Sequence, residues 1–439
     1  MSIIIKNAVI YGEGGKIITG NSLFVDKNKI VKITSDKKYE DTFKIDHPRA
    51  KVIDAKGKLL MPGFYNSHTH SPMNIFRNYG SDLTLNEWLF GKIIPKEQML
   101  TPEDTYWGSL AGQSEMIRSG CTGFADMYEP FQTIYEAARD GGLRACICVA
   151  PLTNKWNNGV KTTLVKHNIV AKQIEETNHS CGGRINTYVE LHSIYLYIAD
   201  KLINSVELAK KYHTGIHMHL HETEKEINDS LKDNGMRPFD FFDKIGAFDV
   251  PTIAAHCVHF TSSEIERAAK YGINVVTNSS SNLKLASGIA PIPEMIDKGV
   301  HVSIGTDGAA SNNNLNIAEE MHLTSLIHKG VTKDPLVLPA RKVIQMATEE
   351  GARALGFGGR AGVIKEKMLA DMIIVDFSGI HTTPVNDYAS AIVYSMQGCD
   401  VDTVIVDGKV LMENRKLKKL DEEKIKWHVN KTAEKLDLK

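Results

Sequence analysis

The sequence has few of the features that mark several large classes of protein. Its six cysteines are scattered without a Cys-x-x-Cys pair, so neither a disulfide framework nor a cysteine-bound zinc cluster is indicated, and we expect free, mostly buried thiols. No run approaches the roughly 20 apolar residues that a membrane helix needs, and the N-terminus has no apolar stretch with a small-residue cleavage site. We therefore expect a cytoplasmic protein with no membrane contact.

An excess of charge of one sign is also missing. The 52 basic and 53 acidic side chains nearly cancel, and no basic run could neutralise a row of phosphates. Nucleic acid is therefore not an expected partner, whereas a small-molecule substrate is. With 439 residues, 42% of them hydrophobic, the chain can bury one large core and a second, smaller one. The sequence leaves homo-oligomerisation open.

The chain divides into a middle part and two ends of similar pattern. Residues 2–59 and those after residue 362 form short β-branched runs broken by glycine turns, which is typical of antiparallel sheet. We therefore predict one composite β-sandwich domain, built from residues 1–59 and 362–439. The charged segment 420–438 has helical spacing, and we expect a solvated helix over this small domain.

Between the two ends, short apolar runs alternate with longer amphipathic segments, which indicates repeated β-α units and a parallel sheet. Eight such runs predict an α/β fold with a (β/α)8 barrel of the TIM type over residues 60–361. The predicted strands are 59–64, 122–126, 143–151, 185–191, 214–221, 252–258, 273–277 and 302–306. A barrel builds its site from the carboxyl ends of its strands, and the residues there are unusually rich in histidine.

The first run is followed by two histidines, His68 and His70. Residues two apart in an extended segment share a face, so both imidazoles can point at one ion. Such pairs also occur by chance, but the position of this pair at the rim of the predicted barrel favours a metal site.

The fifth run carries three histidines on one face, His217, His219 and His221, followed directly by Glu222. Any of the three could bind a metal, and the other two are expected to lie in the core or behind the site. A metalloprotease helix of the H-E-x-x-H type is excluded, because position 225 is a lysine and the segment has the pattern of a strand.

Two later runs end in residues of the same kind. The sixth run holds His256, and the eighth ends near Asp307. Asp307 could bind a metal through one oxygen and accept a proton from the attacking water with the other, or it could cap a helix. Together, strands one, five, six and eight offer nitrogen and oxygen ligands that zinc or iron accepts. No lysine that could bridge two metals follows the fourth run, so we expect a single ion.

With these residues, the chain resembles the amidohydrolase superfamily, and more closely its branch of 5'-methylthioadenosine and S-adenosylhomocysteine deaminases. The likeness covers nearly the whole chain. The matching stretches are residues 62–73, 87–90, 120–127, 219–223, 252–259, 281–291 and 305–313.

The resemblance implies a metal centre and a reaction. One Zn²⁺ per subunit would be held by His68, His70, His219 and Asp307, and Fe²⁺ or Mn²⁺ would accept the same ligands. The implied reaction is the hydrolytic deamination of a 5'-substituted adenosine to its inosine analogue. Water would attack C6 of the ring, Glu222 would protonate N1 and later help ammonia to leave, and His256 with Asp307 would orient or deprotonate the water.

The resemblance also implies substrate contacts. In similar enzymes a glutamate binds the ribose hydroxyls and a strand-four histidine faces the substrate, and here these residues are Glu87 and His192. Trp88, next to Glu87, is expected to line the pocket together with Met73 and Tyr195.

Two stretches depart from the pattern of the branch. Where the branch usually reads G-P-H-S-P-Y, residues 190–195 begin with Glu190 and lack both prolines. Where it reads S-H-N-P-x-S-N, residues 276–282 lack the histidine. The departures concern the pocket wall and leave the metal ligands intact.

Other functions remain open at this point. A deaminase of guanine, a pterin or an oxidised purine, or a triazine chlorohydrolase, would use a similar barrel, although Glu87 favours a ribose-bearing substrate. A non-catalytic metal-binding barrel protein would be expected to have lost a ligand or the proton shuttle, and neither is missing here. The H-x-E and P-C-x-x-C signature of cytidine deaminases is absent.

Overall fold

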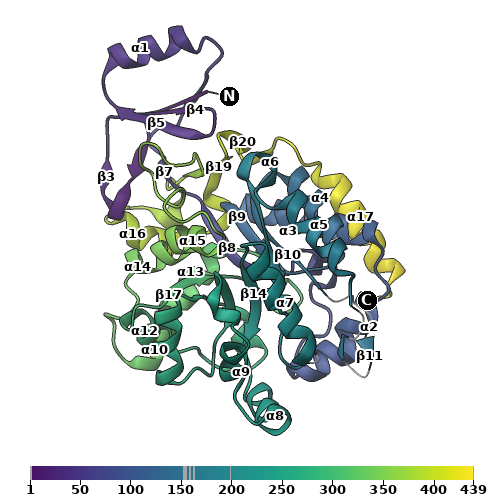
Figure 1. Cartoon of the computed structure of the whole chain (residues 1–439). Helices are drawn as coiled ribbons and strands as arrows, with labels where there is room; N and C mark the ends of the chain where they lie inside the picture. The colour runs from purple at the N-terminus through teal and green to yellow at the C-terminus, as the bar shows by residue number, and fades with distance from the viewer. Residues whose placement is uncertain (1, 152–155, 158–159, 162–163, 198, 439) are drawn as a thin grey trace.

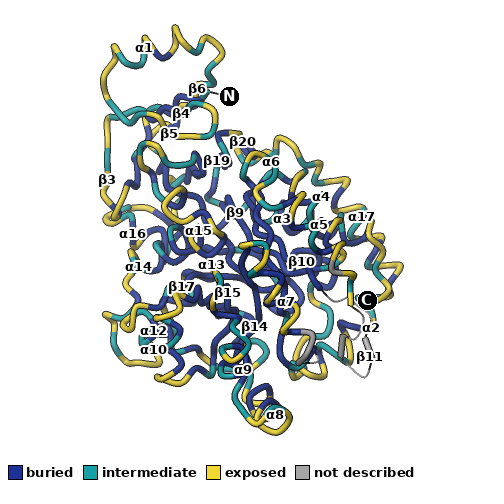
Figure 2. The backbone as a smooth tube through the Cα atoms, in the orientation of Figure 1, coloured by how far each residue is buried: buried dark blue, intermediate teal, exposed yellow. Residues whose placement is uncertain are grey.

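The computed structural model describes residues 2–151, 156–157, 160–161, 164–197 and 199–438. Its central sheet has eight parallel strands in the order β17-β16-β15-β14-β13-β10-β9-β8 (Figure 1). The strands are β8 (Phe64–Thr69), β9 (Cys121–Asp126), β10 (Arg144–Val149), β13 (Ile185–Glu190), β14 (Ile216–Leu220), β15 (Thr252–His256), β16 (Asn274–Thr277) and β17 (His301–Ile304). Residues along these strands are almost all buried (Figure 2), as is typical of a parallel sheet covered by helices.

Hydrogen bonds bring the first and last strands of this sheet together. The amide of Asp307 donates to the carbonyl of His68 at 3.0 Å, and the amide of Thr306 donates to Asn66 Oδ1 at 3.0 Å. The sheet therefore forms a nearly closed barrel, and the predicted fold class is confirmed.

Helices follow the strands and cover the outside of the barrel. The longer ones are α3 (Pro102–Arg118), α4 (Phe131–Gly141), α5 (His167–Thr177), α7 (Ala199–Lys211), α8 (Glu224–Asn234), α9 (Pro238–Lys244), α10 (Ser262–Tyr271) and α13 (Ile317–Thr332). Their ends follow from the sequence. Capping boxes start α3 at Thr101 and α10 at Thr261, and α10 ends at Gly272 in the left-handed conformation. Shorter helices complete the barrel at α2 (Ile94–Glu97), α11 (Ser279–Lys284), α12 (Ile292–Asp297), α14 (Ala340–Gln345) and α15 (Gly351–Ala354).

Both ends of the chain build two further sheets. One has the order β5-β4-β1-β6 and the other β21-β20-β19-β18-β7-β2-β3. The strands are β1 (Ile3–Lys6), β2 (Val9–Tyr11), β3 (Ile17–Ile18), β4 (Ser22–Asp26), β5 (Lys29–Thr34), β6 (Lys51–Asp54), β7 (Leu59–Pro62), β18 (Met372–Val375), β19 (Val401–Val406), β20 (Lys409–Glu413) and β21 (Lys416–Leu417). One apolar cluster joins side chains of both sheets, among them Ile5, Leu23, Met372 and Ile405. The two termini therefore share one core, as predicted, while the exact division at residues 59 and 362 stays a prediction.

The prediction of the first barrel strand over residues 59–64 is wrong. Leu59–Pro62 forms β7, which pairs with β2 and β18 of the terminal sheet, and the barrel strand β8 starts only at Phe64. The two strands lie on either side of Gly63, where an added Cβ would collide with Thr122. An apolar run without alternation does not reveal that the chain changes sheets within it.

The C-terminal helix also lies elsewhere than predicted. The helix α17 (Glu422–Lys435) packs against α3 of the barrel, as Figure 1 shows, and not over the small domain. Its Ile425 joins Leu110 and Ala137 in a small apolar cluster. Its predicted exposure is correct, since only two of its side chains, Ile425 and Thr432, are buried.

Two predictions from the composition can also be compared with the structure. All six cysteines are free, and four of them are buried, which confirms the predicted state of the thiols. No helix in the described part of the chain is long and apolar enough to cross a membrane.

Candidate active site

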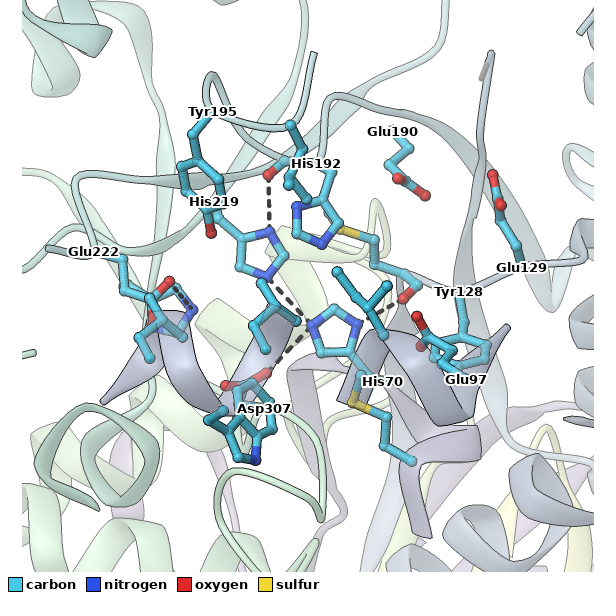
Figure 3. Close-up of a pocket in the computed structure, with 18 of the residues that line it drawn as sticks. His70, Glu97, Tyr128, Glu129, Glu190, His192, Tyr195, His219, Glu222 and Asp307 are labelled. Carbon is cyan, nitrogen blue, oxygen red and sulfur yellow. Dashed lines mark hydrogen bonds and ion pairs between the residues drawn. The ribbon is translucent and has the colours of Figure 1, made fainter. Parts of the chain in front are cut away.

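The predicted site residues meet at the carboxyl-terminal rim of the barrel. His68 lies on β8, His219 on β14 and His256 at the end of β15, while Asp307 follows β17. His70 comes directly after β8. Because all eight strands are parallel, their carboxyl ends open into one cavity, where Figure 3 shows His70, His219, Asp307 and Glu222.

The side chains of His68, His70, His219 and Asp307 approach one another closely. His70 Nε2 lies 3.2 Å from His219 Nε2 and 3.3 Å from Asp307 Oδ1 (Figure 3). His68 Nε2 lies 3.4 Å from Asp307 Oδ1, but it is buried without a hydrogen-bond partner in the described part of the chain. A buried polar atom of this kind is costly unless something binds it.

The outer nitrogen of each imidazole is held by a neighbour. His70 Nδ1 lies 2.7 Å from the carbonyl of Met127, and His219 Nδ1 lies 2.8 Å from the carbonyl of His192. A backbone carbonyl only accepts, so in both residues Nδ1 carries a proton, and in the neutral imidazole the lone pair is on Nε2. This arrangement is typical of histidines that bind metals.

Burial and charge set the protonation states of the cluster. Burial lowers the pKa of His68 to about 4 and that of His219 well below the usual range. Burial acts in the same direction on His70, but the hydrogen bond and charge of Asp307 outweigh it and raise that pKa to about 9. For Asp307, the effect of burial is outweighed by the neighbouring imidazoles of His68 and His70, so its pKa falls well below the usual range. The cluster therefore combines an ionised carboxylate with imidazoles.

This donor set suits a divalent metal ion. Ligand atoms of His68, His219, His256 and Asp307 all lie within 4.8 Å of one another. Imidazole nitrogen and carboxylate oxygen serve zinc and other first-row ions, and the unpartnered His68 Nε2 gives such an ion a specific place. His256 therefore lies near enough to count among the candidate ligands, although the sequence analysis predicted that it orients or deprotonates the water.

Asp307 is held in an unusual backbone conformation. Its φ is 63°, in the left-handed region that an aspartate seldom adopts, and His256 has a φ of 72°. The second carboxylate oxygen of Asp307 accepts hydrogen bonds from Ser281 Oγ at 2.6 Å and Ser311 Oγ at 2.8 Å. Backbone strain that neighbours maintain in this way is concentrated at functional sites.

Glu222 and His256 form the other wall of the site. Glu222 Oε2 lies 3.9 Å from His256 Nε2, and His256 Nδ1 lies 2.7 Å from Asn282 Oδ1. Burial raises the pKa of Glu222, while the nearby His256 opposes this effect. The amide of Glu222 donates to Glu226 at 2.8 Å, which fixes the chain beneath its side chain. A raised pKa brings a buried carboxyl closer to the neutral pH at which an acid-base group has to gain and lose its proton.

The cavity in front of this cluster is largely apolar. Its lining contains Met73, Trp88, Tyr195, Leu85, Leu89, Ile94 and Leu285, and it includes the predicted His192. Trp88 Nε1 is buried and has no hydrogen-bond partner among the described residues. It is therefore a donor that a bound molecule can satisfy.

Glu87 does not line the cavity, in contrast to the prediction for it. Its side chain is exposed and accepts hydrogen bonds from the hydroxyl and amide of Thr84. The residue begins η3 (Glu87–Ile93), a π-helical stretch, with Trp88 turned inward and Glu87 outward. On this turn Trp88 and Leu89 line the cavity, while Glu87 lies on the solvent side.

Three carboxylates that the prediction did not include line the cavity instead. They are Glu97, at the end of α2, Glu129 and Glu190, and they lie on the side away from Glu222 (Figure 3). Tyr197 donates a hydrogen bond of 2.8 Å to Glu190 Oε1. For Glu190 a signal existed, because it stands where the deaminase branch usually has glycine. The sequence offered no comparable signal for Glu97 or Glu129.

The fold and this cluster define a metal-dependent hydrolase. The family comparison agrees: the amidohydrolase family matches residues 59–411, and the chain belongs to that family. The resemblance predicted from the sequence is thereby confirmed.

Relatives that match nearly the whole chain include deaminases of adenine nucleosides. A 5-methylthioadenosine/S-adenosylhomocysteine deaminase of Acetivibrio thermocellus is 47% identical over 99% of this chain and 100% of its own. A 5'-deoxyadenosine deaminase of Methanobrevibacter smithii is 41% identical over 99% and 98%. Among solved structures, an adenosine deaminase from Xanthomonas campestris with bound zinc superposes with a TM-score of 0.90 at 28% identity, covering 99% of this chain and 98% of that one.

Proposed function

We propose that this chain is a zinc-dependent deaminase that converts 5'-substituted adenosines to their inosine analogues and ammonia. The observation that carries the proposal is the convergence of three imidazoles and Asp307 on one cavity, together with Glu222 and His256. The names of relatives that match nearly the whole chain support the nucleoside class. The predicted cytoplasmic location stays a prediction, and homo-oligomerisation stays open.

We assign the metal to His68, His70, His219 and Asp307. When bound there, zinc would activate water for attack on the ring carbon. His256 orients that water from the other side of the cluster, because Asn282 holds its Nδ1 and leaves Nε2 toward Glu222. Asp307 Oδ2 is occupied by two serine hydroxyls, so Oδ1, beside His68 and His70, is the oxygen that would bind the metal.

Glu222 supplies the proton transfer. Its buried carboxyl has a raised pKa and lines the cavity, so it can hold a proton, give it to the ring nitrogen next to the attacked carbon and take another from the water. Protonation of that nitrogen makes the carbon more electrophilic. A second transfer to the amino group then lets it leave as ammonia, and the remaining hydroxyl proton returns to Glu222 as the ring carbonyl forms.

We reassign the ribose contact from Glu87 to Glu97. A carboxylate can accept hydrogen bonds from two neighbouring hydroxyls, and Glu97 lines the cavity whereas Glu87 does not. Trp88 adds a buried N–H donor nearby.

The pair Glu97→Gln and Glu87→Gln tests the assignment. The Glu97 variant is expected to raise KM for nucleosides by at least about tenfold, the cost of a lost hydrogen bond to a charged group, while the Glu87 variant keeps the wild-type value. Equal effects of the two substitutions on KM would contradict the assignment of the ribose contact to Glu97.

The test of the function is ammonia release by zinc-loaded protein from a substrate panel. The panel contains 5'-methylthioadenosine, S-adenosylhomocysteine, 5'-deoxyadenosine, adenosine, guanine, a pterin and a chlorotriazine. We expect fast release from the 5'-substituted adenosines, and their ranking identifies the preferred substituent. Release from guanine or the pterin alone, or chloride release from the triazine, would replace the proposed substrate class. No turnover in a zinc-replete sample would favour the non-catalytic alternative.

A further inference from the structure

A second histidine of β14 lies directly behind the metal-site cluster. His217 is completely buried and precedes His219 by two positions, so both side chains point into the barrel. Its Nε2 lies 2.8 Å from His68 Nδ1, and its Nδ1 lies 3.3 Å from the sulfur of Cys148 on β10. These contacts form a row across the barrel interior, from β8 through β14 to β10.

The row constrains where the protons can sit. A neutral imidazole has one N–H and one acceptor nitrogen. If His68 donates from Nδ1 to His217, its Nε2 keeps the lone pair that faces Asp307, and the proton of His217 lies on Nδ1 toward the sulfur. If the row runs the other way, from the thiol through His217 to His68, then His68 carries its proton on Nε2 and offers no lone pair there.

We propose that His217, supported by Cys148, is a positioning residue that fixes the tautomer and ring orientation of His68 for metal binding. His70 and His219 need no such residue, because a backbone carbonyl holds the Nδ1 of each. His68 is the one member of the three whose outer nitrogen faces another titratable side chain. The proposal rests on the proposed metal site.

His221 shows that a buried histidine on this segment need not serve the site. Its Nε2 accepts a hydrogen bond of 3.0 Å from the amide of Phe239, and its Nδ1 lies 3.3 Å from Arg237. None of these contacts reaches His68 or the cavity. His221→Gln is therefore a control for the loss of a buried imidazole next to the site.

The test uses two amides of different length at position 217. A glutamine places its terminal amide near the position of the imidazole Nε2 and can accept from His68, whereas an asparagine reaches only the position of Nδ1. Zinc dissociation constants are measured by competition with a chelator, and the visible spectrum of the cobalt-substituted protein reports the ligand geometry. Near-UV circular dichroism checks that each variant is folded.

We expect His217→Asn to weaken zinc binding by about 10–100-fold, with a changed cobalt spectrum, and His217→Gln and His221→Gln to stay near the wild-type value. Wild-type affinity in folded His217→Asn would show that His217 only fills the barrel interior, and would overturn the proposal. If the wild type itself fails to bind zinc, the proposed function fails instead.

A second pair of variants covers the case in which His217→Asn does not fold. Cys148→Ser keeps a group that both donates and accepts, and Cys148→Val removes it at similar size. The valine variant is expected to bind zinc more weakly than the serine variant. Equal zinc affinities of the two variants would contradict the role given to Cys148. They would also contradict the proposed direction of the hydrogen bonds, from His68 through His217 to Cys148.

Discussion

Two buried polar clusters lie at opposite ends of the barrel, and they differ in whether an arginine supplies the positive charge. At the amino-terminal end, Arg144 is 1% exposed and forms ion pairs with Asp371 and with Asp407, the latter at 2.8 Å. The Asp371 carboxylate also accepts a hydrogen bond from the Tyr65 hydroxyl at 2.7 Å and one from the amide of Asp407 at 2.8 Å. Every member of this cluster has a partner.

The cluster at the carboxyl-terminal end has only imidazoles to balance its carboxylates. It contains Asp307 and imidazoles, with Glu222 close by, and no lysine or arginine is found among the described residues that line its cavity. His68 Nε2 is left without a hydrogen-bond partner. The difference separates the roles of the two ends: the first cluster joins the barrel to the sheet of the termini, and the second is built to receive an ion.

The largest effect is expected from Glu222→Gln at the carboxyl-terminal cluster. The variant removes proton transfer but no proposed metal ligand, so kcat should fall by about 10²–10⁴-fold while zinc content stays at the wild-type level. Steady-state rates and metal analysis of the same preparation measure both quantities.

Asp307→Asn is the matched comparison for Glu222→Gln. It keeps the size of the side chain but weakens a proposed ligand, so both the rate and the zinc content should fall. If Glu222→Gln keeps most of its activity, its assigned role is wrong. If Asp307→Asn is fully active, Asp307 has no part in the mechanism.

At the amino-terminal cluster, Arg144→Met should act on stability and not on metal binding. It leaves the buried Asp371 and the partly exposed Asp407 without their cation, and breaking a buried pair such as Arg144–Asp371 costs about 3–5 kcal/mol of unfolding free energy. Chemical denaturation measures the loss, and zinc content should be unchanged in the folded fraction. The double variant Arg144→Met with Asp371→Leu should recover part of the loss, because it removes one of the unpaired charges. If the Arg144→Met protein kept its stability but lost its zinc, the two clusters would not have the separate roles proposed for them.

Much of the fold could be predicted because it depends on local patterns. The alternation of apolar runs and amphipathic segments indicated the barrel, and the glycine-broken runs indicated the terminal sheets. The two errors, at residues 59–64 and at α17, have one cause. Both concern which neighbour an element packs against, and a pattern of apolar residues reports only that it packs against something.

The site shows the same limit at the level of single residues. Strand periodicity placed His217, His219 and His221 on one face but could not assign their different partners. Likewise, the resemblance placed a ribose-binding glutamate at Glu87, although the structure brings Glu97 to the cavity. The π-helical turn between the two glutamates has more residues per turn than an α-helix, so spacing along the chain does not give the direction of either side chain.

A third polar cluster lies nearer the solvent. We expect a substitution there to have the smallest effect on stability. Asp104 accepts from Thr432 at 2.7 Å and pairs with Lys435 at 2.7 Å, which ties α17 to α3. Burial raises the pKa of Asp104, but the hydrogen bonds from Lys435 and Thr101 outweigh it and lower the pKa to about 2, from 3.8. The unfolded chain therefore binds a proton at a higher pH than the folded one. Stability from this group is present above about pH 4 and is lost as the pH falls toward 2.

Asp104→Asn should therefore lower the unfolding free energy by no more than about 1 kcal/mol at neutral pH, because solvent screens a partly exposed pair. The difference between the variant and the wild type should shrink as the pH falls from about 4 to about 2, since protonation removes the same charge. Urea denaturation at several pH values measures this difference, with Lys435→Met as the control that removes the partner. A difference that stays constant over this range would mean that the carboxylate charge does not hold α17 in place. A loss as large as that of Arg144→Met would mean that burial does not distinguish this cluster from the one at the amino-terminal end.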